Sequence, residues 1–335
     1  MFEIEIKALG KKFSINSEET ILEAALRNNV QLPFGCLSGN CGSCKGKVLE
    51  GEVNHGNPKP FVLSDEEKTQ GYTLFCQSRA KSNLALDTVT FGNNPYPVKK
   101  FPSRVQSISK INPDVIILGL KTPSNQNFNF TSGQYIDILL KEGKRRSYSM
   151  ANVSKGNNEI ELHVRRMKEG TFTEYAFDKM KVKDILRFEG PLGDFCFDYS
   201  TDKPVIFVAS GTGFAPIKSI LEQLFIDETN RELKLYWGGR HPEDLYLSYL
   251  AKDWSMKHSN FDFIPVVSEP KEEDGWDGRT GFVHAAVMED FPSLENHQVY
   301  ACGAPEMVEA AHRDFIKNRK LPEQEFFSDA FTPGI

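Results

Sequence analysis

The alternation of apolar and polar residues changes twice along the chain, and each change marks a different type of structure. In the first part, residues 17–28 have the spacing of an amphipathic helix, and Ser64 with Glu67 forms a capping box for a second, short helix. Short runs that predict strands occur at residues 2–6, on both sides of 11–12, at 46–49 and at 84–89. Residues 1–92 are therefore predicted to form a small α+β domain.

The pattern breaks at the Gly-Asn-Asn-Pro-Tyr-Pro run of residues 92–97, and we expect an interdomain linker at 93–101. In residues 102–199, short strands separated by turns predict a β-barrel. These strands are expected at 115–120, 135–140, 159–164 and 185–188. In residues 200–335 strands at 205–209, 233–237 and 263–267 alternate with helical stretches such as 216–225. That alternation predicts a parallel α/β sheet of a nucleotide-binding class.

Composition agrees with a chain of two or three domains and excludes some functions. Of the 335 residues, 39% are hydrophobic and 26% are charged, and no run of about 18 apolar residues could span a membrane. The net charge of −6 and the pI of 5.8 lack the basic footprint of a nucleic-acid-binding protein. The N-terminus lacks the basic start and apolar core of a signal peptide, so a cytoplasmic protein is expected. We also expect a monomer.

Four of the six cysteines lie in the first domain, with the spacing Cys36-x4-Cys41-x2-Cys44 followed later by Cys76. A cytosolic chain does not keep a disulfide framework, so clustered thiols point to a metal. The spacing matches the plant-type 2Fe–2S pattern. The loop also contains glycines at positions 35, 39 and 42. Glycines allow the tight, partly left-handed turns with which a backbone wraps a cluster and directs N–H groups to its sulfurs.

Structural zinc is the alternative occupant of these four thiols. Zinc sites usually have a C-x2-C pair in each half of the site, whereas Cys76 has no cysteine near it, which favours iron and sulfur. The stretch 33–44, Pro-Phe-Gly-Cys-Leu-Ser-Gly-Asn-Cys-Gly-Ser-Cys, resembles the cluster loop of plant-type ferredoxin domains. The resemblance implies a β-grasp fold for residues 1–92 and a cluster bound by the four cysteines.

A second group of motifs lies in the predicted barrel. Arg146-Ser147-Tyr148-Ser149 follows a predicted strand, and Asn152 comes just after it. An arginine can bind a pyrophosphate, a tyrosine can lie along an isoalloxazine ring and a serine can reach flavin N5. A solvated arginine and a half-buried tyrosine would explain the same residues. Gly170-Thr171-Phe172-Thr173 then leads into a helix predicted at 174–180, and a glycine turn before a helix can hold phosphate.

Together with Gly190-Pro191-Leu192-Gly193, these motifs resemble the FAD-binding domain of the ferredoxin–NADP reductase superfamily. The resemblance implies a six-stranded antiparallel barrel. It favours FAD over FMN, because the glycine loop serves the pyrophosphate between flavin and adenosine. It also implies that the 146–149 motif, Asn152 and residues 170–173 bind the flavin, with catalytic roles for Tyr148 and Ser149.

A third motif follows the strand at 205–209. Ser210-Gly211-Thr212-Gly213-Phe214-Ala215-Pro216 is a glycine turn and a helix start with proline in its first turn. Its glycines let the backbone approach a dinucleotide pyrophosphate. The motif is not the Rossmann G-x-G-x-x-G pattern. It resembles the G-T-G-x-A-P loop of the same superfamily, which implies that Gly211, Thr212, Gly213 and Pro216 bind the nicotinamide cofactor.

Three further positions complete the expected site. Cys302-Gly303 follows a strand at 298–301, and the resemblance places it beside the nicotinamide with Cys302 in a catalytic role, although a small buried residue is the alternative. Arg240 ends a strand where an adenosine ribose is expected. A basic residue there tolerates the 2′-phosphate of NADPH, whereas acidic residues such as Glu243 and Asp244, which follow, favour NAD, so the sequence leaves both open and the resemblance favours NADH. Phe331 is the aromatic residue that the resemblance places over the flavin, in a catalytic role.

The order ferredoxin, FAD domain, NAD domain resembles two groups of electron-transfer reductases over the whole chain. One group serves oxygenases that hydroxylate aromatic rings or alkanes. The other serves the PMP-dependent dehydrase that makes CDP-3,6-dideoxyhexoses for lipopolysaccharide, and the stretches 190–195, 210–216, 235–240 and 328–332 look closer to it. Both imply electron flow from NADH to FAD, to 2Fe–2S and to a partner enzyme. A metal-binding redox sensor or adaptor is the alternative of a different class.

Overall fold

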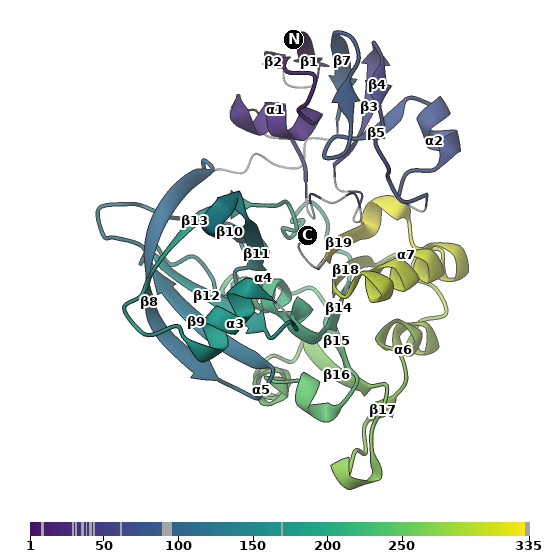
Figure 1. Ribbon diagram of the computed structural model, residues 1–335. Helices are drawn as coiled ribbons and strands as arrows, with labels where there is room; N and C mark the ends of the chain where they lie inside the picture. The colour runs from purple at the N-terminus through teal and green to yellow at the C-terminus, as the bar shows by residue number, and fades with distance from the viewer. Residues whose placement is uncertain are drawn as a thin grey trace. The chain divides into compact units, whose positions relative to one another are not determined.

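The computed structural model describes the chain except positions 8, 9, 29, 31, 35, 36, 38, 40, 41, 43, 61, 89–95, 169 and 332–335, and the side chain at 142. The chain divides into two compact units, Met1–Pro97 and Val98–Ile335 (Figure 1). Each unit buries apolar residues of its own, so each is described by itself. No helix in the described part of the chain has both the length and the apolar character needed to cross a membrane.

Unit 1 is an α+β domain built on a five-stranded mixed sheet in the order β2-β1-β7-β3-β5. β1 pairs antiparallel with β2 and parallel with β7, while β3 is antiparallel to β7 and to β5. The strands are β1 Phe2–Ile6, β2 Lys11–Ile15, β3 Lys45–Glu50, β5 Tyr72–Leu74 and β7 Leu84–Asp87, with a separate pair β4 Val53–Asn54 and β6 Arg79–Ala80. The helices are α1 Ile21–Arg27 and α2 Asp65–Thr69. The predicted strands at 2–6 and 46–49 are confirmed.

Helix α1 begins later than the predicted start at Ser17. Its N-cap is Thr20, whose hydroxyl accepts a hydrogen bond from Glu23 N–H (3.2 Å) while the Glu23 carboxylate accepts one from Thr20 N–H (2.8 Å). A capping box fixes a helix start because it satisfies two backbone donors at once. The box predicted at Ser64 and Glu67 is confirmed at the start of α2.

Unit 2 begins with a six-stranded sheet in the order β11-β10-β13-β8-β9-β12, in which all neighbouring strands are antiparallel. A bridge between Met150 and Leu162 links the two edge strands and closes the predicted barrel. The strands are β8 Lys99–Lys110, β9 Val115–Lys121, β10 Tyr135–Leu139, β11 Arg145–Ser149, β12 Glu159–Arg165 and β13 Ile185–Leu192. Strand β8 starts inside the stretch 93–101 where a linker was expected, because Lys99 already pairs with Gly190. Helix α3, Thr171–Asp178, starts three residues before its predicted position.

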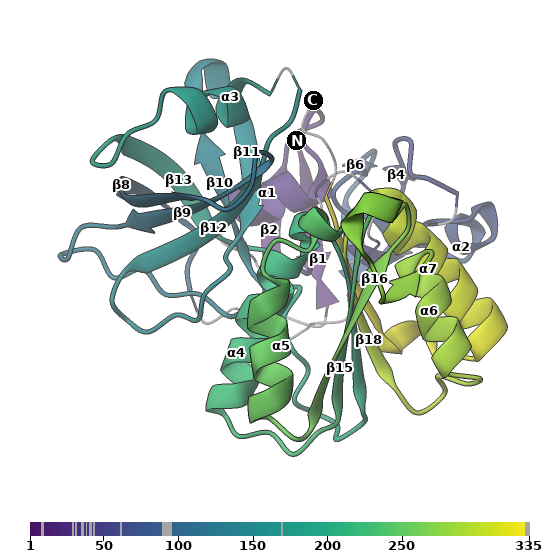
Figure 2. The same ribbon diagram turned by 90° about the horizontal axis from the view of Figure 1, so that it is seen from below.

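The second part of unit 2 is a six-stranded parallel sheet in the order β17-β16-β15-β14-β18-β19. Helices α4 and α5 cover one face of this sheet and α6 and α7 the other (Figure 2). The strands are β14 Val205–Ser210, β15 Leu233–Gly239, β16 Phe261–Val267, β17 Arg279–Thr280, β18 Gln298–Gly303 and β19 Phe326–Ala330. The helices are α4 Phe214–Ile226, α5 Ser248–Lys257, α6 Val283–Asp290 and α7 Pro305–Arg319.

The barrel and the parallel sheet share an apolar contact. Val115 from β9 and Phe195, which follows β13, are buried in the same core cluster as Phe214 of α4 and Trp237 of β15. Burying apolar side chains stabilises such a contact in proportion to the area removed from water. This contact fixes the barrel beside the glycine loop that precedes α4.

Candidate functional site

The loop that carries the predicted cluster ligands is described in part. Cys44 and Cys76 are both buried, and their Sγ atoms are 3.2 Å apart, well beyond the ~2.05 Å of a disulfide bond. Cys36 and Cys41, like Gly35, lie outside the described residues. The two described thiols therefore converge on one location, which fits ligands of a shared metal cluster.

Backbone contacts and glycines bring these two cysteines together. The Phe75 N–H donates a hydrogen bond to Cys44 O (3.0 Å), so the residue before Cys76 is tied to Cys44 itself. The Phe75 ring occupies the space beside Gly46, where a Cβ atom would lie 2.2 Å from it. Gly39 and Gly42 have φ angles of +78° and +80°, so the left-handed turns expected there are confirmed.

The predicted flavin motif lies within strand β11, whose residues face alternate sides. Arg146 and Tyr148 share one side, and Arg145, Ser147 and Ser149 share the other. Arg145 forms ion pairs with Glu189 and with the buried Asp137. In the described part of the chain, Arg146 makes no ion pair, and its guanidinium donates to Arg145 O (2.7 Å). Arg146 is therefore the arginine of this strand that can bind an anion such as a pyrophosphate.

The start of α3 supplies a second anion-binding element. Gly170 is the N-cap, and a Cβ there would lie 2.5 Å from Thr173 Oγ1. That hydroxyl is 3.0 Å from Gly170 O and accepts a hydrogen bond from the Met167 N–H (3.2 Å), so it braces the turn. The first N–H groups of a helix have no partner inside the helix and attract anions. In the described part of the chain, the backbone N–H groups of residues 171–173 have no partner, which fits a phosphate.

Ring packing brings these two flavin elements together. The Tyr148 ring lies 5.3 Å from the Phe172 ring, centroid to centroid, so β11 and the start of α3 are neighbours. Burial raises the pKa of the Tyr148 hydroxyl well above its usual range, so this side chain stays neutral. Ser149, at the end of β11, is buried. A guanidinium, an aromatic ring and helix N–H groups within one region fit the parts of FAD.

Asn152 has a different position from the one its motif suggested. Its amide group donates to Val153 O (3.2 Å) and Glu159 O (3.1 Å), and its Oδ1 accepts from the Glu161 N–H (2.8 Å). The side chain thus joins the turn after β11 to strand β12. The flavin contact of Asn152 stays a prediction, and the structure gives the residue a bracing contact that the motif did not indicate.

The nicotinamide motif packs directly against the Cys302-Gly303 element. Gly211–Gly213 forms a 3-10 turn, and a Cβ on Gly213 would lie 2.1 Å from Cys302 O. A Cβ on Gly303 would lie 2.2 Å from Ser210 Oγ, and its φ angle of +138° also requires glycine. Ser210 Oγ accepts a hydrogen bond from the Ala304 N–H (2.9 Å). The carboxyl ends of β14 and β18 therefore form one surface, the place where parallel sheets bind nucleotides.

Cys302, Pro216 and Phe331 lie around this surface. The side chain of Cys302 is fully buried. This burial, and to a smaller extent the negative charge of the neighbouring Asp329, raises the pKa of the Cys302 thiol well above its usual range. Pro216 is a buried residue in the first turn of α4. The Phe331 N–H donates to Gly303 O (2.8 Å), so the C-terminal strand ends at this element. Their cofactor roles stay predictions.

Arg240 lies exposed in the turn after β15. The backbone N–H of Arg240 donates a hydrogen bond to one carboxylate oxygen of Asp244 (2.9 Å). The other oxygen of Asp244 accepts a hydrogen bond from the guanidinium of Arg165 in the barrel (2.7 Å). Arg165 also approaches Gly211, where a Cβ would lie 2.8 Å from its guanidinium. The turn expected at the ribose is thus tied to the barrel as well as to the sheet.

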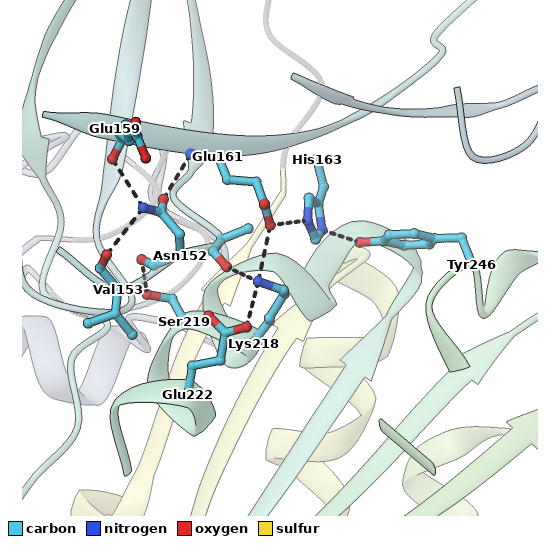
Figure 3. A network of polar contacts seen from close by, with 10 residues as sticks. Asn152, Val153, Glu159, Glu161, His163, Lys218, Ser219, Glu222 and Tyr246 are labelled. Atoms are coloured by element: carbon cyan, nitrogen blue, oxygen red, sulfur yellow. Dashed lines mark hydrogen bonds and ion pairs between the residues drawn. The ribbon is translucent and has the colours of Figure 1, made fainter. Parts of the chain in front are cut away.

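Sequence reasoning missed the polar contacts between strand β12 and helix α4 (Figure 3). Glu161, His163, Lys218 and Tyr246, which we call the barrel–sheet bridge, form a chain of hydrogen bonds and ion pairs. The signal that could have indicated it is Lys218, a charged residue five positions after Gly213 in the largely apolar first half of α4. A buried lysine in such a helix needs partners.

Three family models match separate parts of the chain. The 2Fe-2S iron-sulfur cluster binding domain matches residues 4–81, the oxidoreductase FAD-binding domain residues 102–197, and the oxidoreductase NAD-binding domain residues 207–313. These matches confirm the predicted β-grasp, barrel and parallel-sheet classes and the three predicted cofactors: a 2Fe–2S cluster, FAD and a nicotinamide dinucleotide.

Relatives match over almost the whole length. The CDP-6-deoxy-L-threo-D-glycero-4-hexulose-3-dehydrase reductase of Yersinia pestis is 41% identical over 332 residues, 99% of this chain and 98% of that protein. The phenol 2-monooxygenase reductase component of a Pseudomonas species is 31% identical over 336 residues, 98% of this chain and 94% of that protein. The crystal structure of a cytochrome P450 reductase from Amycolatopsis superposes with a TM-score of 0.81 at 32% identity, covering 99% of both chains.

Proposed function

Because the chain belongs to the family of iron–sulfur flavoprotein reductases, we propose that it takes electrons from NADH and delivers them to a separate dehydrase that acts on a CDP-bound 6-deoxyhexulose. Flavin accepts an electron pair as hydride and releases single electrons, and a 2Fe–2S cluster carries them one at a time. The product class would be CDP-3,6-dideoxyhexoses for lipopolysaccharide. The protein would act in the cytoplasm as a monomer.

The residues of unit 2 would hold and orient the two dinucleotides. Arg146 and the backbone N–H groups at the start of α3 would bind the flavin pyrophosphate, since both are donors without a carboxylate partner in the described chain. Tyr148 and Ser149 would contact the isoalloxazine. The loop Gly211–Gly213, packed on Cys302-Gly303, would present its backbone to the nicotinamide dinucleotide.

Four thiolates would hold the cluster in unit 1. Cys44 and Cys76, whose sulfurs lie 3.2 Å apart, would be two of the ligands, and Cys36 and Cys41 the others. A thiolate ligand set of this kind leaves no position for a substrate, so the cluster would transfer electrons only. No acid–base residue is required for that step.

The choice of acceptor rests on one observation, the 41% identity to the dehydrase reductase over 99% of the chain, against 31% to the phenol hydroxylase component. An oxygenase component is therefore the second candidate. A redox sensor or adaptor is disfavoured, because a sensor needs no nicotinamide loop.

A reconstitution experiment tests the acceptor. The purified protein, with NADH, is mixed anaerobically with a PMP-loaded dehydrase and CDP-4-keto-6-deoxyglucose. In a separate, air-saturated reaction it is mixed with a phenol hydroxylase oxygenase component and phenol, because hydroxylation consumes O2. We expect NADH-dependent deoxysugar formation in the first reaction and no hydroxylation in the second. The reverse result would assign the chain to the oxygenases, and parallel assays with NADPH measure the preference for NADH.

A further inference from the structure

Lys218 joins helix α4 to the flavin side of the barrel. Its Nζ atom donates to Ala151 O (2.8 Å) and lies 3.1 Å from the Glu161 carboxylate and 2.8 Å from the Glu222 carboxylate (Figure 3). An ammonium group has three N–H donors, so these three acceptors use all of them. Only 8% of the side chain is exposed.

Ser219, the next residue of α4, binds the next backbone carbonyl of the barrel. Ser219 Oγ donates to Asn152 O (2.8 Å), so two consecutive residues of α4 bind two consecutive carbonyls, those of Ala151 and Asn152. These carbonyls follow the flavin motif directly, and α4 follows the nicotinamide loop directly. The register of α4 against the barrel is therefore fixed by directional bonds at the point where the two cofactor elements meet.

A second path returns from the barrel to the glycine loop. His163 lies 3.1 Å from the Glu161 carboxylate through Nε2 and 2.7 Å from the Tyr246 hydroxyl through Nδ1. The Tyr246 ring packs edge-on against Trp237 at 5.2 Å, and Trp237 Nε1 donates to Gly211 O (3.0 Å). The Gly211–Gly213 loop is thus bound at one end through Trp237 and at the other through α4, and both connections end on Glu161.

The pKa shifts of Glu161 and His163 agree with the contacts of this bridge. Burial would raise the pKa of the Glu161 carboxyl, but the hydrogen bond from His163 and the charge of Lys218 outweigh it and lower that pKa to about 2. Burial lowers the pKa of His163, which stays a neutral imidazole that donates from Nε2 to Glu161 and accepts at Nδ1 from Tyr246. The neutral imidazole thus makes both hydrogen bonds of His163 at once.

Stability alone does not explain a buried lysine at this position. Apart from Ser219, the other buried residues of α4 are apolar, and replacing a buried ion pair by apolar residues is often neutral or stabilising. An ion pair with a full set of hydrogen bonds does specify one relative placement of two elements. Hydride transfer depends on placement, because a misplacement of about 1 Å can cost about a hundredfold in rate.

We propose that Lys218 is a positioning residue for hydride transfer: by binding Ala151 and Glu161 of the barrel from helix α4, it fixes the nicotinamide loop against the flavin strand. It touches neither cofactor element itself. The inference rests on the proposed use of both dinucleotides, and it adds a residue that none of the cofactor motifs contains.

The test compares variants of the holoenzyme by anaerobic stopped-flow reduction of the flavin at increasing NADH concentrations. Lys218→Met keeps the length of the side chain and removes its donors. We expect its limiting rate constant to fall by about tenfold or more, with the Kd for NADH within about twofold of wild type. Lys218→Arg, which keeps charge and donors, should recover part of the rate. Lys252→Met, at an exposed lysine of α5, should match wild type.

A readout besides turnover is amide hydrogen exchange at residues 211–215 in the FAD-loaded protein. Lys218→Met should exchange faster there, whereas Lys252→Met should not. Tyr246→Phe is the gentler variant in case Lys218→Met loses flavin. It removes only the hydroxyl that faces His163 and should lower the same rate constant by a few-fold at unchanged Kd.

Wild-type rate constants in both Lys218→Met and Tyr246→Phe would overturn the positioning role, as would equal losses in Lys218→Met and Lys218→Arg. Failure of the wild-type flavin to be reduced by NADH would instead refute the proposed function. The two failures are therefore distinguishable in one set of experiments.

Discussion

Units 1 and 2 would place their proposed functional groups by different means. In unit 1 the groups are side chains at fixed sequence spacing, and two of them, Cys44 and Cys76, already lie with their sulfurs 3.2 Å apart. In unit 2 they are mostly backbone N–H groups of glycine turns, and side chains distant in sequence hold those turns in place. The sequence position of a cysteine is enough to identify it as a candidate ligand. The direction of a backbone N–H group depends on the conformation of its turn, and therefore on the side chains that pack against that turn.

The two units should therefore fail differently. Loss of one ligand in unit 1 removes a whole cofactor, because a cluster needs all of its ligands. Loss of one contact in unit 2 weakens binding or misplaces a loop by a graded amount, because several donors share the cofactor. Each unit has buried residues of its own, so damage should stay in the unit where it is made.

The largest effect is expected from Cys76→Ser or Cys41→Ser. Either change should bring 2Fe–2S content down to background while FAD stays bound, since the ligands lie in unit 1 and the flavin motifs in unit 2. Iron and flavin analysis of the purified variants measures both. Cys196→Ser, which changes a cysteine of unit 2, is the matched control and should keep both cofactors. Parallel loss of flavin and iron would contradict the separation.

Removal of unit 1 should abolish one activity and spare another. A fragment of residues 98–335 should still oxidise NADH with ferricyanide, which draws electrons from flavin, but should not reduce cytochrome c or the partner enzyme efficiently. The fragment must include Lys99, because β8 starts there and pairs with β13. Steady-state rates with the three acceptors decide the matter. Full activity with the partner enzyme would place the cluster off the electron path.

This fragment also tests whether tethering, rather than charge, brings unit 1 to the flavin. Residues 1–92 carry ten Lys and Arg against eleven Asp and Glu, so steering by net charge is weak. Covalent linkage raises the effective concentration of one unit near the other without a tight interface. Adding separate unit 1 to the fragment should therefore restore cytochrome c reduction only at high concentration.

An intermediate effect is expected for Arg146→Ala. Removing a charge-assisted phosphate contact should cost about 1.5–3 kcal/mol, or roughly ten- to a hundredfold in FAD affinity. Arg145→Ala is the matched control on the same strand. It breaks the ion pairs to Glu189 and Asp137, so it should lower the melting temperature of unit 2 but change FAD affinity far less. Titration of the apoprotein with FAD measures the affinity, and equal affinities of the two variants would remove Arg146 from the flavin site.

The smallest effect is expected for Thr20→Ala at the N-cap of α1. Loss of the capping box should lower the free energy of unfolding of unit 1 by about 1 kcal/mol. Thr20→Ser keeps the hydroxyl and should recover most of it. Denaturant titration followed separately by the iron–sulfur and flavin absorption reads out the two units. A shift in the flavin transition of the same size would show that the units unfold together.

The sequence by itself determined the three domain classes and the chemistry of their cofactors. Strand and helix periodicities, the Cys36-to-Cys76 spacing and the glycine motifs are local patterns, and local patterns are set by backbone sterics and ligand geometry. For the same reason the capping box at Ser64 was visible in advance. The start of α1 was misplaced because Ser17 and Thr20 are both good N-caps, and only the burial of Ile21 and Leu22 selects between them.

Only the tertiary structure decided which polar side chains are free to act. Arg145 and Arg146 are adjacent and chemically identical. Arg145 forms ion pairs with Glu189 and Asp137, whereas in the described part of the chain Arg146 forms none. Strand β8 extends into the expected linker because Lys99 pairs with Gly190 of β13. That partner strand lies far along the chain, so the local sequence around the linker does not reveal the pairing. Lys218 acquires its proposed role through the Ala151 carbonyl, 67 residues away in sequence. Contacts of that range depend on how strands and helices pack, which no local pattern records.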